Sequence, residues 1–142
     1  MERGLPEKLV AHGAGVILAG MLVGFAYALV VTGDLAGSER AWRMAHLEGV
    51  LNGLLLLAVA GVADRLALSG RAVTILAWSL IVTAWGNVVA AVIGATLGVR
   101  GLAPGGSSGN TLVYVLFMIA VVGVLVALVL VVTGARAAAR EA

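Results

Sequence analysis

Residues 42–63 read WRMAHLEGVLNGLLLLAVAGVA, and the only formally charged residues among them are Arg43 and Glu48. An α-helix needs about 20 predominantly apolar residues to cross a hydrocarbon core about 30 Å thick. The stretch lacks the regular alternation of polar and apolar residues that marks a transmembrane β-strand. It therefore predicts a membrane-spanning helix, which carries the polar residues His46, Glu48 and Asn52 into the membrane.

Three more apolar stretches of similar length accompany this one. The segments between them are short and rich in glycine or charge, and we expect Asn110 or Thr111 to cap the last helix. The sequence thus predicts an all-α fold, an integral membrane four-helix bundle that forms a single domain over residues 1–142. The expected transmembrane helices cover about residues 9–32, 42–63, 72–99 and 111–133.

The composition of the whole chain agrees with this interpretation. Of the 142 residues, 62% are hydrophobic and only 11% are charged, whereas soluble domains have about 45–50% and about 25%. The absence of cysteine excludes disulfide scaffolds, zinc–thiolate sites, iron–sulfur clusters and cysteine nucleophiles. A net charge of +2 is too small for a nucleic-acid-binding surface. We therefore expect the chain to contact the lipid bilayer and not to bind nucleic acid.

Positively charged residues predict the orientation of the bundle. With four spans, the two termini and the middle loop share one side of the membrane. Cytoplasmic segments are enriched in lysine and arginine, so both termini are predicted to be cytoplasmic. That side carries six of the nine lysine and arginine residues, namely Arg3, Lys8, Arg65, Arg71, Arg136 and Arg140.

His46 begins a stripe along one face of the second span. At about 100° per residue, Gly49 and Gly53 share a narrow face with His46. An imidazole followed by two positions without side chains suits a flat ligand such as a porphyrin, with His46 as the metal ligand. The same stripe also suits the close packing of two helices through small residues, and spacing alone favours that second interpretation.

Glu48 and Asn52 form another polar pair, four residues apart and therefore on a common face. One interpretation is the hydrogen-bonding and proton-handling wall of a pocket. The other is contact between helices, with Glu48 pairing with Arg43 or Arg40. Asn52 lies deeper in the membrane, where its amide needs a protein or ligand partner. Asn87 of the third span is positioned to reach either Asn52 or a ligand.

The two histidines, His12 and His46, each lie near the start of a span, and consecutive spans start at opposite faces of the membrane. We expect them to be about 20 Å apart, too far to ligate one haem within a protomer. His12 is expected to be a solvated histidine near the membrane surface. A haem on His46 alone would keep one axial position open for a substrate.

The block AHLEGVLNG at residues 45–53 resembles the signature of hydroxylaminobenzene mutases, which are small four-helix bacterial membrane enzymes. Through the third span and the loop after it, the resemblance continues with Asn87-Val-Val-Ala-Ala, Gly94-Ala95 and Pro104-Gly-Gly. More distantly, the chain is similar to styrene oxide isomerases. That second resemblance rests on His46 with Asn52-Gly53, on Trp85-Gly86-Asn87 and on His12-Gly13.

The resemblance to styrene oxide isomerases implies a haem b held between the protomers of a homotrimer. The histidine that matches His46 ligates the iron there, so Gly49 and Gly53 become candidates for contact with the cofactor. The asparagine that matches Asn52 helps to hold the substrate oxygen.

Two positions depart from that pattern. A tyrosine follows Trp-Gly-Asn in styrene oxide isomerases, where this chain has only Ala90 and Ala91, and an aspartate before the motif is matched by Thr83 or Ala84. Glu48, in contrast, is what the mutase pattern expects.

Together, the resemblances imply a mutase in the bacterial inner (cytoplasmic) membrane. It would rearrange a small aromatic substrate, an aryl hydroxylamine, to an ortho-aminophenol with ferric haem b as Lewis acid. Asn52, Glu48 and Asn87 are the expected catalytic residues; Asn52 would orient the moving oxygen and Glu48 would shuttle a proton. The first alternative is an epoxide-to-aldehyde isomerase, and the second is a non-catalytic haem-binding or oligomeric membrane subunit.

Overall fold

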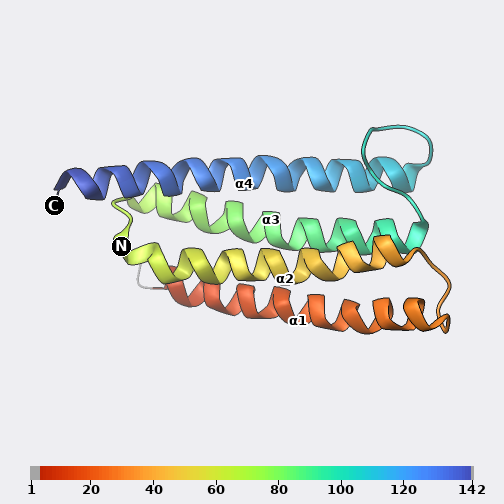
Figure 1. Cartoon of the computed structure of the whole chain (residues 1–142). Helices are drawn as coiled ribbons and strands as arrows, with labels where there is room; N and C mark the ends of the chain where they lie inside the picture. Colours follow the sequence, from red (N-terminus) through yellow and green to blue (C-terminus); the bar gives the residue numbers. More distant parts are fainter. Residues whose placement is uncertain (1–3, 142) are drawn as a thin grey trace.

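The computed structural model describes residues 4–141 and contains four long helices, each running in the opposite direction to the one before it (Figure 1). All four are long and apolar enough to cross a membrane, and the part of the chain described contains no strand. These observations confirm the predicted all-α membrane bundle. The helices are α1 (Leu5–Thr32), α2 (Glu39–Val62), α3 (Gly70–Leu97) and α4 (Ser108–Glu141), with a short 3-10 turn, η1 (Ala63–Arg65), after α2.

The start of α1 and the end of α4 lie at the same end of the bundle (Figure 1). This placement follows from four antiparallel helices joined by short loops. That the shared end faces the cytoplasm remains a prediction from the distribution of positive charge. Arg3, which contributes to that prediction, lies outside the described residues.

The helix ends differ in detail from the expected spans. α1 begins about one turn earlier than expected, with Pro6 in its first turn, where the missing N–H of proline costs nothing. The start of α4 corrects a prediction, because the cap is neither Asn110 nor Thr111. The hydroxyl of Ser107 accepts a hydrogen bond from the backbone N–H of Asn110 at 3.1 Å, which is the geometry of an N-cap.

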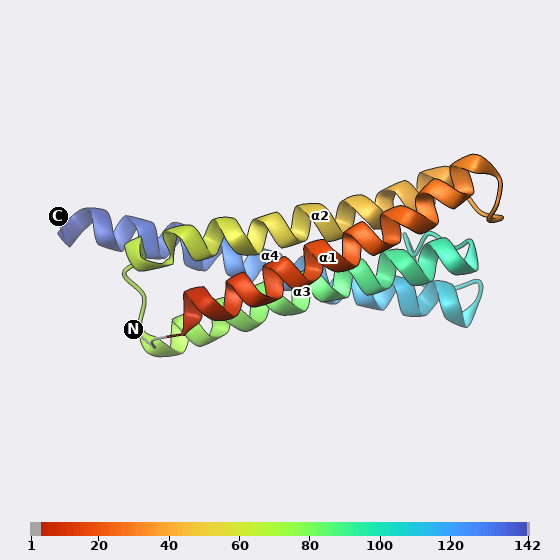
Figure 2. The ribbon, with the colours of Figure 1, turned by 90° about the horizontal axis from the view of Figure 1, so that it is seen from below.

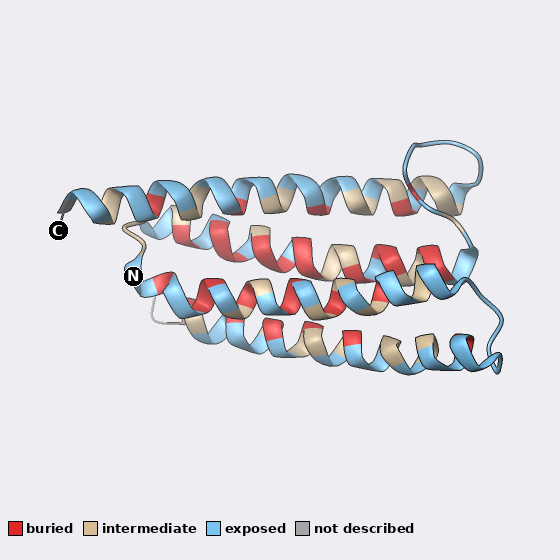
Figure 3. Cartoon of the chain, viewed as in Figure 1, coloured by how far each residue is buried: buried red, intermediate tan, exposed pale blue. Residues whose placement is uncertain are grey.

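The four helices do not form a closed ring of neighbours. α1 packs mainly on α2, α2 also packs on α3, and α1 crosses α3 at an angle (Figure 2). Among the described residues, α4 packs on α3 and on η1, without extensive contact to α1 or α2. Most of the surface of α4 is therefore exposed and apolar (Figure 3), as is usual for a helix that faces lipid or another subunit.

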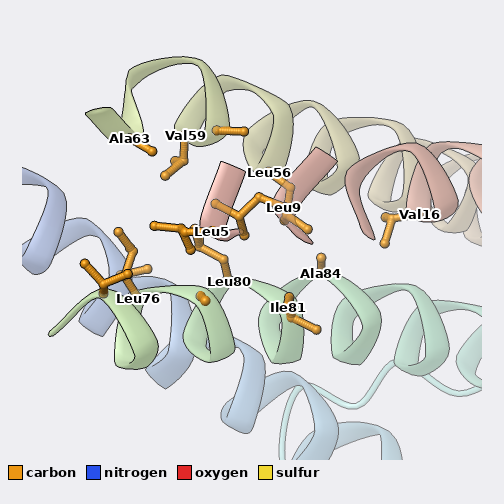
Figure 4. Close-up of a cluster of buried hydrophobic side chains, with 14 of the residues drawn as sticks. Leu5, Leu9, Val16, Leu56, Val59, Ala63, Leu76, Leu80, Ile81 and Ala84 are labelled. Carbon is orange, nitrogen blue, oxygen red and sulfur yellow. The ribbon is translucent and has the colours of Figure 1, made fainter. Parts of the chain in front are cut away.

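The large buried side chains gather toward the end of the bundle that holds both termini. Leu9 of α1, Leu56 of α2, and Leu76 and Leu80 of α3 are fully buried in this cluster (Figure 4). At the other end of the bundle, α3 presents mainly alanine and glycine to its neighbours. The helices there fill less of the space between them, and this is the end where the chain leaves a cavity.

Candidate functional site

Glycines from both helices line the contact between α1 and α2. A Cβ atom on Gly49 would overlap the backbone of Gly20, and a Cβ on Gly53 would lie 2.7 Å from the carbonyl oxygen of Gly13. Gly49 and Gly53 are both buried under α1. Because the backbone of α1 occupies the space above them, the structure favours the packing interpretation of this stripe over contact with a cofactor. They are instead the small-residue seam that lets two membrane helices approach closely.

His46 lies on the same side of α2, against α1. Its Nδ1 is 2.9 Å from the carbonyl oxygen of Gly20. A carbonyl oxygen only accepts hydrogen bonds, so Nδ1 carries the proton and the Nε2 atom of a neutral ring keeps its lone pair. Gly24 makes room for the ring, since a Cβ there would approach Nδ1 to 2.9 Å. Sequence reasoning missed Gly20 and Gly24, although their spacing of four residues is a signal for a helix contact.

Glu48, Asn52 and Asn87 form one chain of hydrogen bonds. Asn87 Nδ2 donates to Asn52 Oδ1 at 3.2 Å, which joins α3 to α2. Asn52 Nδ2 donates to Glu48 Oε2 at 2.8 Å and to the Glu48 backbone oxygen at 2.9 Å. Among the described residues, Glu48 is thus held by the Asn52 amide and not by Arg40 or Arg43.

These hydrogen bonds determine which donor and acceptor atoms remain available to a ligand. Asn52 is only 8% exposed, and its two amide hydrogens and its oxygen all have partners. A carboxylate can accept several hydrogen bonds, so Glu48 keeps acceptor capacity for a ligand. In this arrangement Asn52 holds the Glu48 carboxylate in place, and Glu48 is the member of the three with acceptor capacity to spare.

Glu48 lies in the wall of a cavity of about 470 Å³. The cavity is open on one side and is bordered by the first half of α2, the second half of α3, the start of α4 and the loop between α3 and α4. Its walls are mostly apolar and small. The lining residues are Ser38, Arg40, Ala41, Met44, Glu48, Ala90, Ala91, Gly94, Ala95, Val99, Arg100, Leu102, Val113 and Phe117.

His46 is absent from this lining, although it precedes Glu48 by only two residues. Two residues correspond to a rotation of about 200° around a helix. His46 therefore packs on α1 whereas Glu48 points into the cavity on the far side of α2. The structure separates the predicted metal ligand from the predicted acid–base group by the width of one helix.

The model of the styrene oxide isomerase family matches residues 5–136. The chain belongs to the styrene oxide isomerase family. No curated protein matches it. The family match bears out the more distant of the two resemblances, and with the four candidate spans it makes the chain an isomerase-type, multi-pass membrane protein.

The two positions that depart from the styrene oxide isomerase pattern lie in different parts of the structure. Ala90 and Ala91, which stand where the pattern has a tyrosine, line the cavity and leave it wider. Thr83 is 1% exposed, and its hydroxyl donates to the backbone oxygen of Ala120 at 2.9 Å. Thr83 therefore joins α3 to α4 and lies outside the cavity wall.

His12 of this family member corrects another expectation. It is half-buried where α1 crosses α3, and its Nδ1 accepts a hydrogen bond from the indole nitrogen of Trp85 at 3.2 Å. It is therefore not simply a solvated surface residue. Twelve residues separate His12 from Gly24, the contact of His46, which is about 18 Å of helix. This spacing along α1 agrees with the predicted separation of the two histidines.

The donor atoms of this styrene oxide isomerase family member limit which metals it can hold. Residues 4–141 contain no group of three or more histidine, cysteine, aspartate or glutamate side chains that could hold a bare ion. One imidazole with a free Nε2 can instead hold a metal that brings its own equatorial ligands, as a haem does. The hydrogen bond from Nδ1 to a backbone carbonyl is also the usual support of a metal-ligating histidine. His46 fits the role of a haem ligand.

Proposed function

We propose that this chain is a membrane isomerase that rearranges aryl hydroxylamines to ortho-aminophenols. The observation that carries the proposal is the carboxylate of Glu48 in the wall of an apolar cavity, held by the Asn52 amide. An apolar cavity suits an aromatic substrate that partitions from the bilayer. A carboxylate in that wall suits proton transfer to and from the substrate.

His46 would hold a haem b through Nε2, with Gly20 fixing the tautomer and the direction of the ring. When bound, a ferric haem supplies a Lewis acid that polarises the N–O bond of the substrate. This assignment is supported by the resemblance noted above, in which His46 matches the histidine that ligates the iron in styrene oxide isomerases. In this assignment the haem binds beside the contact between α1 and α2, and the substrate binds in the cavity.

The residues of the cavity would handle the proton of the rearrangement. The N–O bond breaks and the hydroxyl group joins the ortho carbon of the ring, which then carries both oxygen and hydrogen. Glu48 would accept the proton from this carbon as the ring becomes aromatic again and return it to the nitrogen. Asn87, through Asn52, would keep the carboxylate aimed at the ring. The apolar walls would exclude water from the reacting atoms.

The opposite placement of His46 and Glu48 supports an active site at a boundary between protomers. In a cyclic homotrimer, the arrangement that the resemblance implies, every boundary joins one face of a subunit to a different face of its neighbour. His46 of one protomer would then serve the cavity of the next. We propose this assembly in the bacterial inner membrane, with the termini in the cytoplasm.

A second candidate function, epoxide-to-aldehyde isomerisation, is favoured by the family match itself. It would use the same ligation by His46. Against it stands the cavity wall, where Ala90 and Ala91 offer no phenol to hold an epoxide oxygen. We therefore rank it second.

Purified protein loaded with haem and incubated with hydroxylaminobenzene tests the proposal. We expect 2-aminophenol as product, and little phenylacetaldehyde from styrene oxide under the same conditions. Loaded protein that yields no aminophenol would refute the mutase assignment, and turnover of styrene oxide alone would establish the second candidate.

Absorption spectra of variants test the cofactor site independently of turnover. His46→Ala should lose the Soret band, because it removes the one proposed protein ligand. Asn52→Ala should keep the band and lose most turnover, because it releases Glu48. His12→Ala should also keep the band. A normal ferric spectrum in His46→Ala would overturn the assignment of the ligand.

A further inference from the structure

The mouth of the cavity carries two positive charges that the proposed reaction does not use. Arg40 of the first turn of α2 and Arg100 of the loop after α3 both line the cavity, and both are exposed. Ser38, the N-cap of α2, lines it as well, so the positive end of the helix dipole adds to the same region. Glu39 lies beside Arg40 in the chain but is not part of the lining.

The loop that carries Arg100 is anchored to α4. Asn110 Oδ1 accepts the backbone N–H of Gly101 at 2.9 Å, and Asn110 Nδ2 donates to the backbone oxygens of Ala103 and Gly105, each at 2.9 Å. Gly101 has a positive φ of 58°, and a Cβ there would overlap Val113. The backbone next to Arg100 is therefore fixed against α4 by specific contacts.

On the face of α2 that lines the cavity, a positive, an apolar and a negative side chain follow one another along the helix. Arg40, Met44 and Glu48 follow one another at intervals of four residues and all line the cavity. Eight residues place the Cα atoms of Arg40 and Glu48 about 12 Å apart. Most of the other lining residues are apolar, Ala91 and Phe117 among them. A single ring with a polar group at each end matches this order: an anionic group at the mouth and a proton-exchanging group at Glu48.

We propose that the cavity selects aryl hydroxylamines that carry a carboxylate at the ring position opposite the nitrogen. This inference rests on the proposed function and names its substrate class. The carboxylate pairs with the guanidinium groups of Arg40 and Arg100, which are suited to planar, two-point recognition of carboxylates. The hydroxylamine end then lies beside Glu48, and the ring lies against the apolar walls.

Binding of benzoate, an unreactive probe, tests the inference without any turnover. Benzyl alcohol is the neutral comparison, and the full chain in phosphatidylcholine nanodiscs is the sample. We expect benzoate to bind on the order of tenfold more tightly than benzyl alcohol. Arg100→Gln and Arg40→Gln should each remove most of this preference. Arg43→Gln is the matched control, because Arg43 is an exposed arginine of α2 outside the lining, and it should keep the preference.

Two results would overturn the inference. The first is equal binding of benzoate and benzyl alcohol by the wild-type protein, which would mean that the arginines do not recognise a carboxylate in the cavity. The second is a loss of preference in Arg43→Gln as large as in Arg100→Gln. Neither result depends on catalysis, so failure of this inference is distinguishable from failure to form aminophenol.

Discussion

The two faces of α2 differ in how closely they are packed. Toward α1, Gly49 and Gly53 bring two backbones together and leave no space. Toward α3 and α4, Glu48 borders a cavity of about 470 Å³. One helix can therefore hold a histidine by close packing on one side and leave an open, mostly apolar cavity on the other. His46 belongs to the packed face, and Glu48 belongs to the open one.

The largest effect is expected on the packed face. Gly49→Ala should lower the free energy of unfolding by about 2–3 kcal/mol, because the added methyl group overlaps the backbone of Gly20 and the helices must separate. The measurement is denaturant unfolding in detergent micelles, followed by circular dichroism.

Gly61→Ala is the matched control on the same helix. A Cβ at Gly61 would meet nothing within 4 Å, and alanine favours a helix over glycine by about 1 kcal/mol. We expect stability to be unchanged or slightly raised. Equal destabilisation by both substitutions would contradict the assignment of a packed face to Gly49.

A smaller effect is expected where the open face meets α3. Asn52→Leu should cost about 1–2 kcal/mol of stability, because it leaves the amide of Asn87 and the carboxylate of Glu48 without their partner. A double-mutant cycle with Asn87→Leu should give a coupling energy of about 1 kcal/mol. Additive losses would show that the two asparagines do not interact.

The smallest effect is expected at Thr83, away from both faces of α2. Thr83→Val keeps the shape of the side chain and removes its hydrogen bond to the Ala120 backbone oxygen, which should cost about 1 kcal/mol. Turnover at saturating substrate should not change, because Thr83 does not line the cavity. A large loss of activity at unchanged stability would assign Thr83 a part in the reaction.

The helices could be predicted from sequence because hydropathy and length are local properties of each span. The link between Asn87 and Asn52 was among the predicted possibilities, since a buried amide must find a partner. The partner of the Gly49 and Gly53 stripe was not predictable in the same way. Spacing shows that a face is flat, whereas only the packing of helices shows that α1 covers it.

His12 and the cavity escaped prediction for the same reason. The bond of His12 to Trp85 depends on the angle at which α1 crosses α3. The cavity depends on a loop held by Asn110, a residue for which the local pattern predicts a helix cap. Contacts between segments far apart in the chain decide both.

We propose that His46 and Glu48 act in one site from two different protomers, and mixed oligomers test this claim most directly. Co-expression of His46→Ala and Glu48→Gln chains with different tags, followed by tandem purification, isolates mixed oligomers. Each variant alone should be inactive. In a mixed cyclic trimer, about one third of the boundaries join an intact His46 to an intact Glu48, so about one third of the wild-type rate of aminophenol formation should return. Mixed oligomers as inactive as the two parent variants would contradict the claim.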